Sequence, residues 1–163
     1  NSGGIAKRLI EFAKSLVGAL PGGLAHVNIV AAMMFGAIAG SAGAAAAAIG
    51  SFMSERMEKE GYTKEYGVAI NVTSATTGLL IPPSNIFIIY SLASGGVSIG
   101  ALFLAGYLPG ILTGLILMAI ALVWAKKKGF PTGKRSSFKH IMRSFFDAIP
   151  SLLLLIIMLL YHR

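Results

Sequence analysis

A long block without a single charged residue or histidine runs from Tyr66 to Ala125. A block of this length is typical of a chain that crosses a bilayer, where one helical span takes about 20 residues. Pro82 and Pro83 lie inside the block. Because proline has no N–H and its ring clashes with a carbonyl one turn back, we expect the helix to break at this pair. Carbonyls freed at membrane depth persist only where protein or a polar cavity satisfies them.

The composition supports a membrane protein. The chain of 163 residues is 55% hydrophobic and 12% charged, whereas a soluble domain is about 25% charged. Its net charge of +8 would suggest nucleic acid in a soluble protein. Here we assign the basic residues to the cytoplasmic fringes of membrane spans and expect no nucleic-acid partner. There are no cysteines, which excludes disulfides and cysteine metal sites.

A second uncharged stretch, from Ser15 to Ser54, is too long for one span. As a single helix it would reach about 60 Å, twice a hydrocarbon core of about 30 Å. Its glycines permit a tight turn, and we predict a re-entrant hairpin of two short helices that meet near Gly40–Ser41. The alternative is that the small residues only let helices pack closely.

The remaining segments follow from periodicity, charge and turn residues. Residues 149–163 carry an apolar run of about 13 residues, too short for a span, so we expect the chain to be part of a larger protein. The predicted order is an amphipathic interfacial helix (1–20), the hairpin (21–54), a charged loop (55–66), the discontinuous transmembrane helix (67–94), a second transmembrane helix (99–125), a basic loop with an interfacial helix (126–148) and the start of a truncated transmembrane helix (149–163).

The hairpin leaves and returns on one side, and the two spans bring the chain back again. All charged segments then share one side, which the positive-inside rule makes cytoplasmic. The only turn on the opposite side, near Gly95, has no charge.

The apolar blocks hold no Asp or Glu, so a carboxylate pair or proton relay is not available there, and we predict no enzyme. His26 is the one ionisable candidate, and we expect it to pack the hairpin base. The remaining candidate ligands in the apolar blocks are neutral oxygen atoms. Carbonyls at helix breaks together with Ser and Thr hydroxyls suit Na⁺, and two such clusters lie at 40–42 and 73–85. The alternative for the hydroxyls is hydrogen bonding between helices.

Four stretches resemble the large membrane subunit of the tripartite ATP-independent periplasmic (TRAP) transporters. They are GGIAKRLIEFAKSLVGALPGGLAHVNI (3–29), GAIAGSAGAAAAAIG (36–50), TSATTGLLIPPSN (73–85) and ALFLAGYLPGIL (101–112). The resemblance implies an all-α polytopic protein of the bacterial inner membrane, half of an elevator-type inverted-repeat transporter. It implies sodium-coupled uptake of an organic acid, with Na⁺ as the coupling ion and no organic cofactor. The implied partners are a periplasmic solute-binding protein, a small four-helix membrane subunit and the lipid bilayer.

The resemblance also implies a site between the hairpin tip and the break. Two sets follow from it: substrate contacts at Ser41, Thr76, Thr77, Ser84 and Asn85, and sodium ligands among Gly40, Ser41, Ala42, Thr76, Pro82, Pro83 and Ser84. The motif TGLLIPPSN is more similar to members that handle sugar acids such as sialic acid than to C4-dicarboxylate members. The all-alanine run Ala44–Ala48 stands where many members carry a polar or acidic residue, which leaves that side of the implied pocket less polar.

Three alternative hypotheses for the function are also compatible with the sequence. A structural membrane subunit would use the glycines and prolines for helix packing alone. A channel-like pore would conduct without saturable, coupled uptake. An intramembrane enzyme is the least supported, because the chain has no nucleophile–base pair.

Overall fold

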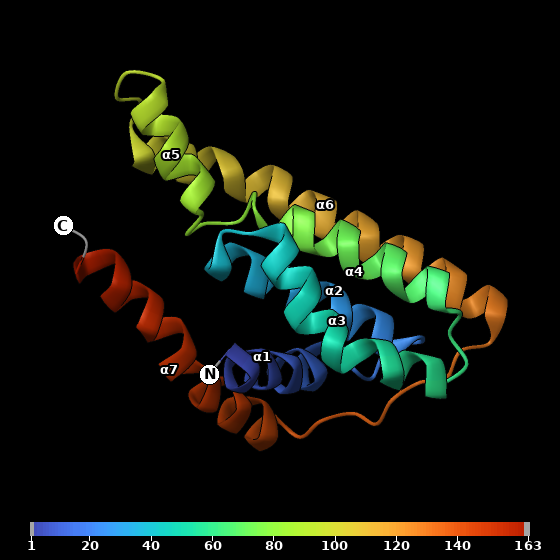
Figure 1. The fold of residues 1–163 in the computed structure, drawn as a ribbon. Coiled ribbons are helices and arrows are strands. Elements are labelled where there is room, and N and C mark those ends of the chain that lie inside the picture. The colour runs from blue at the N-terminus through green and yellow to red at the C-terminus, as the bar shows by residue number, and fades with distance from the viewer. Residues whose placement is uncertain (1, 162–163) are drawn as a thin grey trace.

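A computed structural model describes the backbone of residues 2–161 and the side chains of residues 4–150 and 153. Within that range the chain is helical, and its one β-type pairing is an isolated bridge between Pro21 and Thr132. The helices, drawn in Figure 1, are α1 (Ser2–Val17), α2 (Gly23–Ala39), α3 (Ala42–Lys59), α4 (Lys64–Gly78), α5 (Asn85–Ala93), α6 (Ile99–Lys128) and α7 (Phe138–Tyr161). The predicted all-helical class is confirmed.

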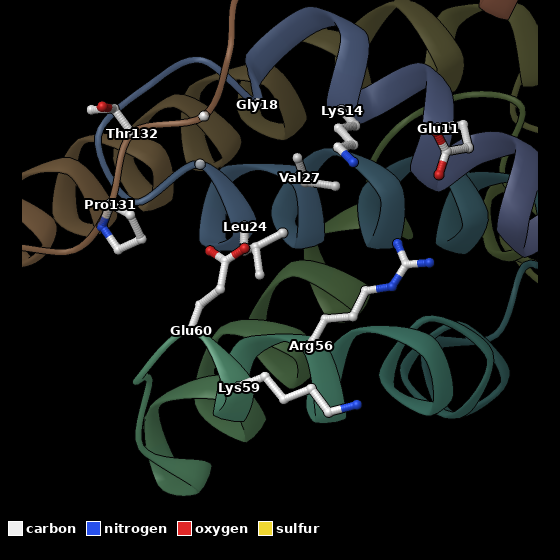
Figure 2. Close-up of a pocket in the computed structure, with 12 residues that line it drawn as sticks. Glu11, Lys14, Gly18, Leu24, Val27, Arg56, Lys59, Glu60, Pro131 and Thr132 are labelled. Carbon is white, nitrogen blue, oxygen red and sulfur yellow. The ribbon is translucent and has the colours of Figure 1, made fainter.

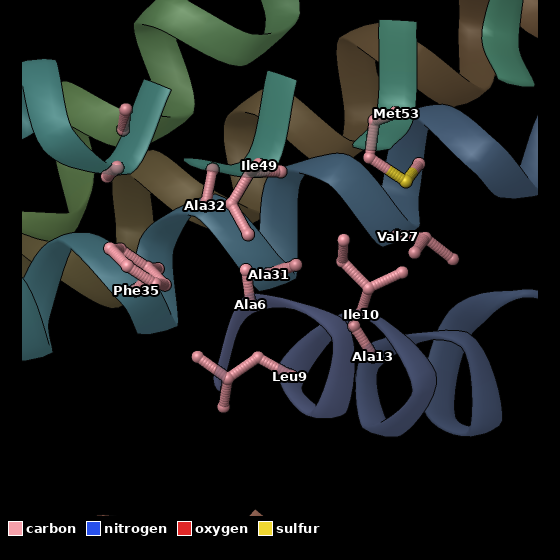
Figure 3. Packing of buried hydrophobic residues seen from close by; sticks show 12 residues of the cluster. Ala6, Leu9, Ile10, Ala13, Val27, Ala31, Ala32, Phe35, Ile49 and Met53 are labelled. Atoms are coloured by element: carbon pink, nitrogen blue, oxygen red, sulfur yellow. The ribbon is translucent and has the colours of Figure 1, made fainter. Parts of the chain in front are cut away.

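Helix α1 lies across the hairpin. Its buried face consists of Ala6, Leu9, Ile10 and Ala13, which pack into one apolar cluster with residues of α2 and α3 (Figure 3). On its other side the ring of Phe12 lies 5.6 Å from that of Phe145 in α7. Leu16 is exposed, so the apolar stripe predicted for residues 1–20 is only partly covered by protein.

The hairpin turns where the glycine pattern predicts. Helix α2 ends at Ala39 and α3 begins at Ala42, which leaves Gly40 and Ser41 as the turn. Helices α2 and α4 approach each other closely at one glycine on each helix, Gly36 and Gly78. A Cβ on Gly36 would lie 2.8 Å from the carbonyl oxygen of Ala75, and a Cβ on Gly78 would lie 2.6 Å from that of Met33. The two helices therefore cross at backbone contact. The re-entrant placement of the hairpin in a membrane stays a prediction.

The charged segment 55–66 is mostly helical, which corrects the predicted loop. Helix α3 continues to Lys59 and α4 begins at Lys64. Lys59 pairs with Glu55 at 2.6 Å, one turn apart. Alternating charges at such spacing support an exposed helix as well as a loop, and this is why the sequence pattern was misread. Only residues 60–63 connect the helices, and Thr63 caps α4 by accepting a hydrogen bond from the N–H of Tyr66.

Helices α4 and α5 are the two halves of one interrupted element. The non-helical segment between them runs from Leu79 to Ser84 and contains the proline pair. Figure 1 shows this segment beside the turn of the hairpin, at the end of the bundle away from the loop 60–63. The predicted break is present.

Helix α6 is the one helix among the described residues that is long and apolar enough to cross a membrane. It continues through Pro109. Gly106, Gly110 and Gly114 recur every four residues on the side that faces the break and α2, where added Cβ atoms would meet Leu80, Ile81 and Met33. This glycine stripe lets the broken segment lie directly against α6.

Stacked aromatic rings connect the carboxyl end of α6 to the loop 60–63 and to the first turn of α4. Phe130 stacks on Tyr62 with centroids 4.0 Å apart, and Trp124 stacks on Tyr66 at 6.0 Å. Lys128 lies 5.8 Å from the Trp124 ring, a distance at which an ammonium is attracted to the ring face. Burial, followed by the charge of Glu60, raises the pKa of Tyr62 to about 12.

Residues 138–161 form one helix, which corrects the division at residue 148. Helix α7 continues through Pro150, because an interior proline removes a single backbone hydrogen bond and can bend a helix without ending it. The basic loop is confined to residues 129–137, after α6 has ended at Lys128. Of the truncated span predicted for 149–163, residues 162–163 lie outside the described range.

Candidate functional site

The tip of the hairpin is shaped by Gly40 and Ser41. Gly40 adopts a left-handed conformation (φ 60°), and its N–H donates to the Gly36 carbonyl at 2.9 Å, which closes the end of α2. Ser41 is extended, and its Oγ accepts a hydrogen bond from the N–H of Ala44 at 3.2 Å, which caps α3. Left-handed glycine at a helix end and serine at the next helix start are the residues each position favours.

The break is held by Ser84, which is fully buried. Its Oγ–H donates to the Leu79 carbonyl at 2.6 Å, so one hydroxyl spans the interruption. The N–H groups of residues 79–81 turn back onto the carbonyls of residues 76–78. The carbonyls of residues 81–83 take part in no hydrogen bond among the described residues. Three backbone oxygens next to a buried serine are therefore available as ligands.

The tip and the break are in contact. A Cβ built on Gly40 would lie 2.5 Å from Nδ2 of Asn85, 2.7 Å from its Cβ and 2.9 Å from its Cγ. Asn85 is the first residue of α5, and Ser41 immediately precedes α3. The amino ends of two helices therefore meet at one place, where free N–H groups and the helix dipoles favour an anion.

The two threonines of the predicted site lie in the last turn of α4. Thr76 is exposed and Thr77 half-buried. Their hydroxyls donate back to the carbonyls of Val72 and Thr73, each at 2.8 Å, so their donors are used within the helix and their oxygen lone pairs remain. No hydrogen bond among the described residues joins either threonine to the hairpin tip.

Among the other predicted residues, Pro82 is buried and Pro83 half-buried within the break. Ala42 begins α3 at the tip. The structure thus brings Gly40, Ser41 and Ala42 to the same end of the bundle as Pro82–Asn85, and it leaves the threonines on the adjoining turn of α4.

A buried amide network behind the tip was not predicted. Nδ2 of Asn71 in α4 donates to the Ala46 carbonyl of α3 at 2.7 Å, and Oδ1 of Asn71 accepts from Nδ2 of Asn28 in α2 at 3.4 Å. A Cβ on Gly50 would lie 2.7 Å from Nδ2 of Asn71, so the missing side chain leaves room for the amide to reach α3. The signal was Asn28 in the largely apolar helix α2 together with Asn71 in the middle of α4, since polar side chains in membrane helices form hydrogen bonds with neighbouring helices.

His26 lies at the other end of α2, in its first turn, and is 1% exposed. Neither ring nitrogen has a hydrogen-bond partner among the described residues. The burial agrees with packing at the hairpin base, away from the tip. No group of three or more His, Cys, Asp or Glu side chains that could hold a metal ion occurs in the part of the chain that the structure describes.

Comparison with known proteins gives a consistent result. The profile of the DctM component of the tripartite ATP-independent periplasmic transporters matches residues 1–163. The uncharacterised protein YgiK of Salmonella typhimurium is 56% identical over 159 residues, which are 98% of this chain and 37% of YgiK.

Two relatives from Vibrio cholerae have assigned substrates. The C4-dicarboxylate TRAP transporter large permease protein DctM is 41% identical over 98% of this chain and 35% of its own length. The sialic acid TRAP transporter large permease protein SiaM is 40% identical over 94% of this chain and 36% of its own length. The chain thus spans just over a third of these relatives, which are named as permeases and are not enzymes. A match along the whole chain, on a fold with the expected turn and break, makes the chain a member of the DctM family of TRAP transporter large permease subunits.

Proposed function

We propose that this chain is part of a sodium-coupled importer of an organic acid in the bacterial inner membrane. The observation that carries the proposal is the contact between Gly40 at the hairpin tip and Asn85 at the start of α5. It brings two helix interruptions together in a chain that belongs to a permease family. Broken helices that meet in this way are a common means of holding ions and substrates in secondary transporters.

The carboxylate of the substrate binds at the amino ends of α3 and α5. At the start of α3, the side chain of Ser41 accepts a hydrogen bond only from the N–H of Ala44. At the start of α5, the side chain of Ser84 accepts none. The first N–H groups of both helices are therefore free to donate to an anion. Ser41, Asn85 and the hydroxyls of Thr76 and Thr77 supply further polar contacts around it.

Na⁺ binds beside the carboxylate, on oxygen. The carbonyls of residues 81–83 and the hydroxyl of Ser41 are its ligands in this proposal, and Ser84 fixes the carbonyls through its hydrogen bond to Leu79. At ~4 Å and an effective dielectric constant of about 20, a cation and a carboxylate attract by about 4 kcal/mol. Each ligand then raises the affinity for the other, which is the thermodynamic basis of coupled uptake.

The complete transporter is proposed to contain a second hairpin and break, outside this chain, and to move the site across the membrane as an elevator. A periplasmic solute-binding protein delivers the substrate and a small membrane subunit braces the large one. The charged segments 55–65 and 126–143 face the cytoplasm. Relatives assigned to a C4-dicarboxylate and to sialic acid are about equally similar, so the substrate class is an organic acid and sialic acid remains one candidate.

The test is sodium-dependent uptake by the complete transporter in proteoliposomes. Ser41→Ala and Ser84→Ala are each expected to raise the sodium concentration needed for half-maximal uptake. Thr113→Ala is the matched control, because Thr113 bonds only to carbonyls of its own helix α6. Unchanged sodium dependence in both serine variants, with assembly alone affected, would favour a packing role for the tip and the break.

A further inference from the structure

A cavity of about 400 Å³ lies at the base of the hairpin, at the opposite end of α2 from the tip. Figure 2 shows it between α1, the start of α2, the carboxyl end of α3 and the linker at Pro131–Gly133. The cavity is remote from the proposed substrate site and takes no part in it.

The wall of the cavity at the linker is close-packed backbone. A Cβ on Gly133 would lie 2.1 Å from the Gly18 carbonyl oxygen, and a Cβ on Gly23 would lie 2.2 Å from the same atom. The N–H of Gly22 donates to the Pro131 carbonyl at 3.2 Å. Glycine is required at these contacts, so the cavity is enclosed by fixed main chain on this side.

Two basic side chains enter the cavity from different helices. Lys14 extends from α1 and Arg56 from α3 into the same space (Figure 2). The one ion pair within 4.0 Å among the described residues joins Lys59 to Glu55. Lys14 and Arg56 are therefore unpaired, whereas Lys59 is already neutralised. Glu11 and Glu60 line the cavity as well, which adds a region of opposite charge.

The cavity lies where apolar helices give way to charge. Leu24 and Val27, near the start of the apolar helix α2, line one side. Next to the cavity, a Cβ on Gly22 would lie 2.6 Å from Cβ of Ala125, the last residue before three lysines end α6. Tryptophan and lysine at the end of an apolar helix are typical of the membrane–water interface, and they predict that the cavity lies at the depth of lipid headgroups.

We propose that this cavity binds a phosphate group, held between Lys14 and Arg56. Guanidinium and ammonium groups are the side chains that recognise phosphate, the first through paired N–H donors. Glu11 and Glu60 favour a ligand that also carries a cation, as a phosphoethanolamine headgroup does. The bound phosphate is shared by two cations that belong to α1 and α3, and it thereby links the arm helix to the hairpin base. The proposal goes beyond transport and does not depend on the sodium site.

The test uses the complete permease, purified in detergent and studied by native mass spectrometry. Phosphatidylethanolamine, phosphatidylglycerol, phosphatidylcholine or inorganic phosphate is added in separate titrations. The double variant Lys14→Gln/Arg56→Gln is expected to lose roughly tenfold or more in affinity for the phosphate-bearing ligand, the equivalent of about 1.4 kcal/mol. The double variant Lys64→Gln/Arg135→Gln removes the same charges outside the cavity and is expected to stay within about twofold of the unmodified protein.

Two further comparisons identify the source of the phosphate and protect against misfolding. Binding of phosphatidylethanolamine that depends on Lys14 and Arg56 assigns a lipid headgroup, and equally dependent binding of inorganic phosphate alone assigns a free ion. Lys14→Arg/Arg56→Lys keeps both charges and is expected to retain binding. Equal losses in the cavity and control variants, or no loss in either, would overturn the proposal.

Discussion

Replacing Gly40 by alanine probes the contact on which the proposed site depends. Gly40 has φ +60°, a conformation that costs a residue with a Cβ about 1–2 kcal/mol. The new Cβ would also lie 2.7 Å from Cβ of Asn85 and 2.5 Å from its Nδ2. Cβ of Asn85 is fixed by the backbone of α5, so the tip and the break must separate, and such overpacking costs about 1–3 kcal/mol. The expected total is roughly 2–5 kcal/mol.

Gly43→Ala is the matched control, three residues further along the hairpin. The nearest atom to its added Cβ is Oγ of Ser41 at 4.0 Å. Because Gly43 lies in the first turns of α3, alanine there is expected to be neutral or to stabilise the helix by up to about 1 kcal/mol. The pair thus introduces the same methyl group at the same tip, with a clash in one variant and none in the other.

Both variants are compared by sodium titration of uptake in proteoliposomes and by thermal unfolding of the complete transporter. Since about 1.4 kcal/mol corresponds to a factor of ten, Gly40→Ala is expected to raise the half-saturating sodium concentration roughly tenfold or more. Gly43→Ala should change it by no more than about twofold. Similar sodium dependence in the two variants would refute the reasoning that the tip and the break form one site.

Three other predictions concern the framework around the site. Asn71→Ala removes the hydrogen bond to the Ala46 carbonyl and should lower the free energy of unfolding by about 1–3 kcal/mol. The hydroxyl of Thr73 is exposed and bonds only within α4, so Thr73→Ala should change that free energy by no more than about 0.5 kcal/mol. Equal effects of the two variants would contradict the amide network. Gly106→Ala would place a Cβ 2.6 Å from the Leu80 carbonyl oxygen and should lower the melting temperature, whereas Gly100→Ala, with 3.8 Å to its nearest neighbour, should not. Burial raises the pKa of Tyr62 to about 12. The free energy of unfolding should therefore fall between about pH 10 and 12, where only the unfolded state readily loses the phenolic proton. Tyr62→Phe should remove this contribution when the melting temperature is measured over the same pH range.

The turn and the break could be predicted because each rests on a local rule. Gly40 with Ser41 marks a helix end followed by a helix start, and Pro82–Pro83 excludes a continuous helix. Helix boundaries near charge could not be placed in the same way. Alternating charges suit an exposed helix and a loop equally, as residues 55–59 show. Pro150 likewise marked no boundary, because α7 continues through it.

Contacts between segments distant in the sequence were beyond prediction from local pattern. The glycines of α6 recur every four residues, and this spacing does not reveal by itself that they contact Leu80 and Ile81. The hydrogen-bond partners of Asn71 in α2 and α3 lie 43 and 25 residues away, beyond the range of any local pattern. The cavity between Lys14 and Arg56 required the packing of α1 on the hairpin base, which no spacing in the sequence encodes.

The most direct test of the central claim is a high-resolution cryo-electron microscopy map of the complete transporter, recorded with and without sodium. The account predicts an ion density between the turn at Gly40–Ser41 and the segment Ile81–Ser84 that is present only with sodium and lies within about 2.6 Å of backbone oxygens, the upper end of the range for hard cations on oxygen ligands. A sodium-dependent density elsewhere, with none at this position, would contradict it.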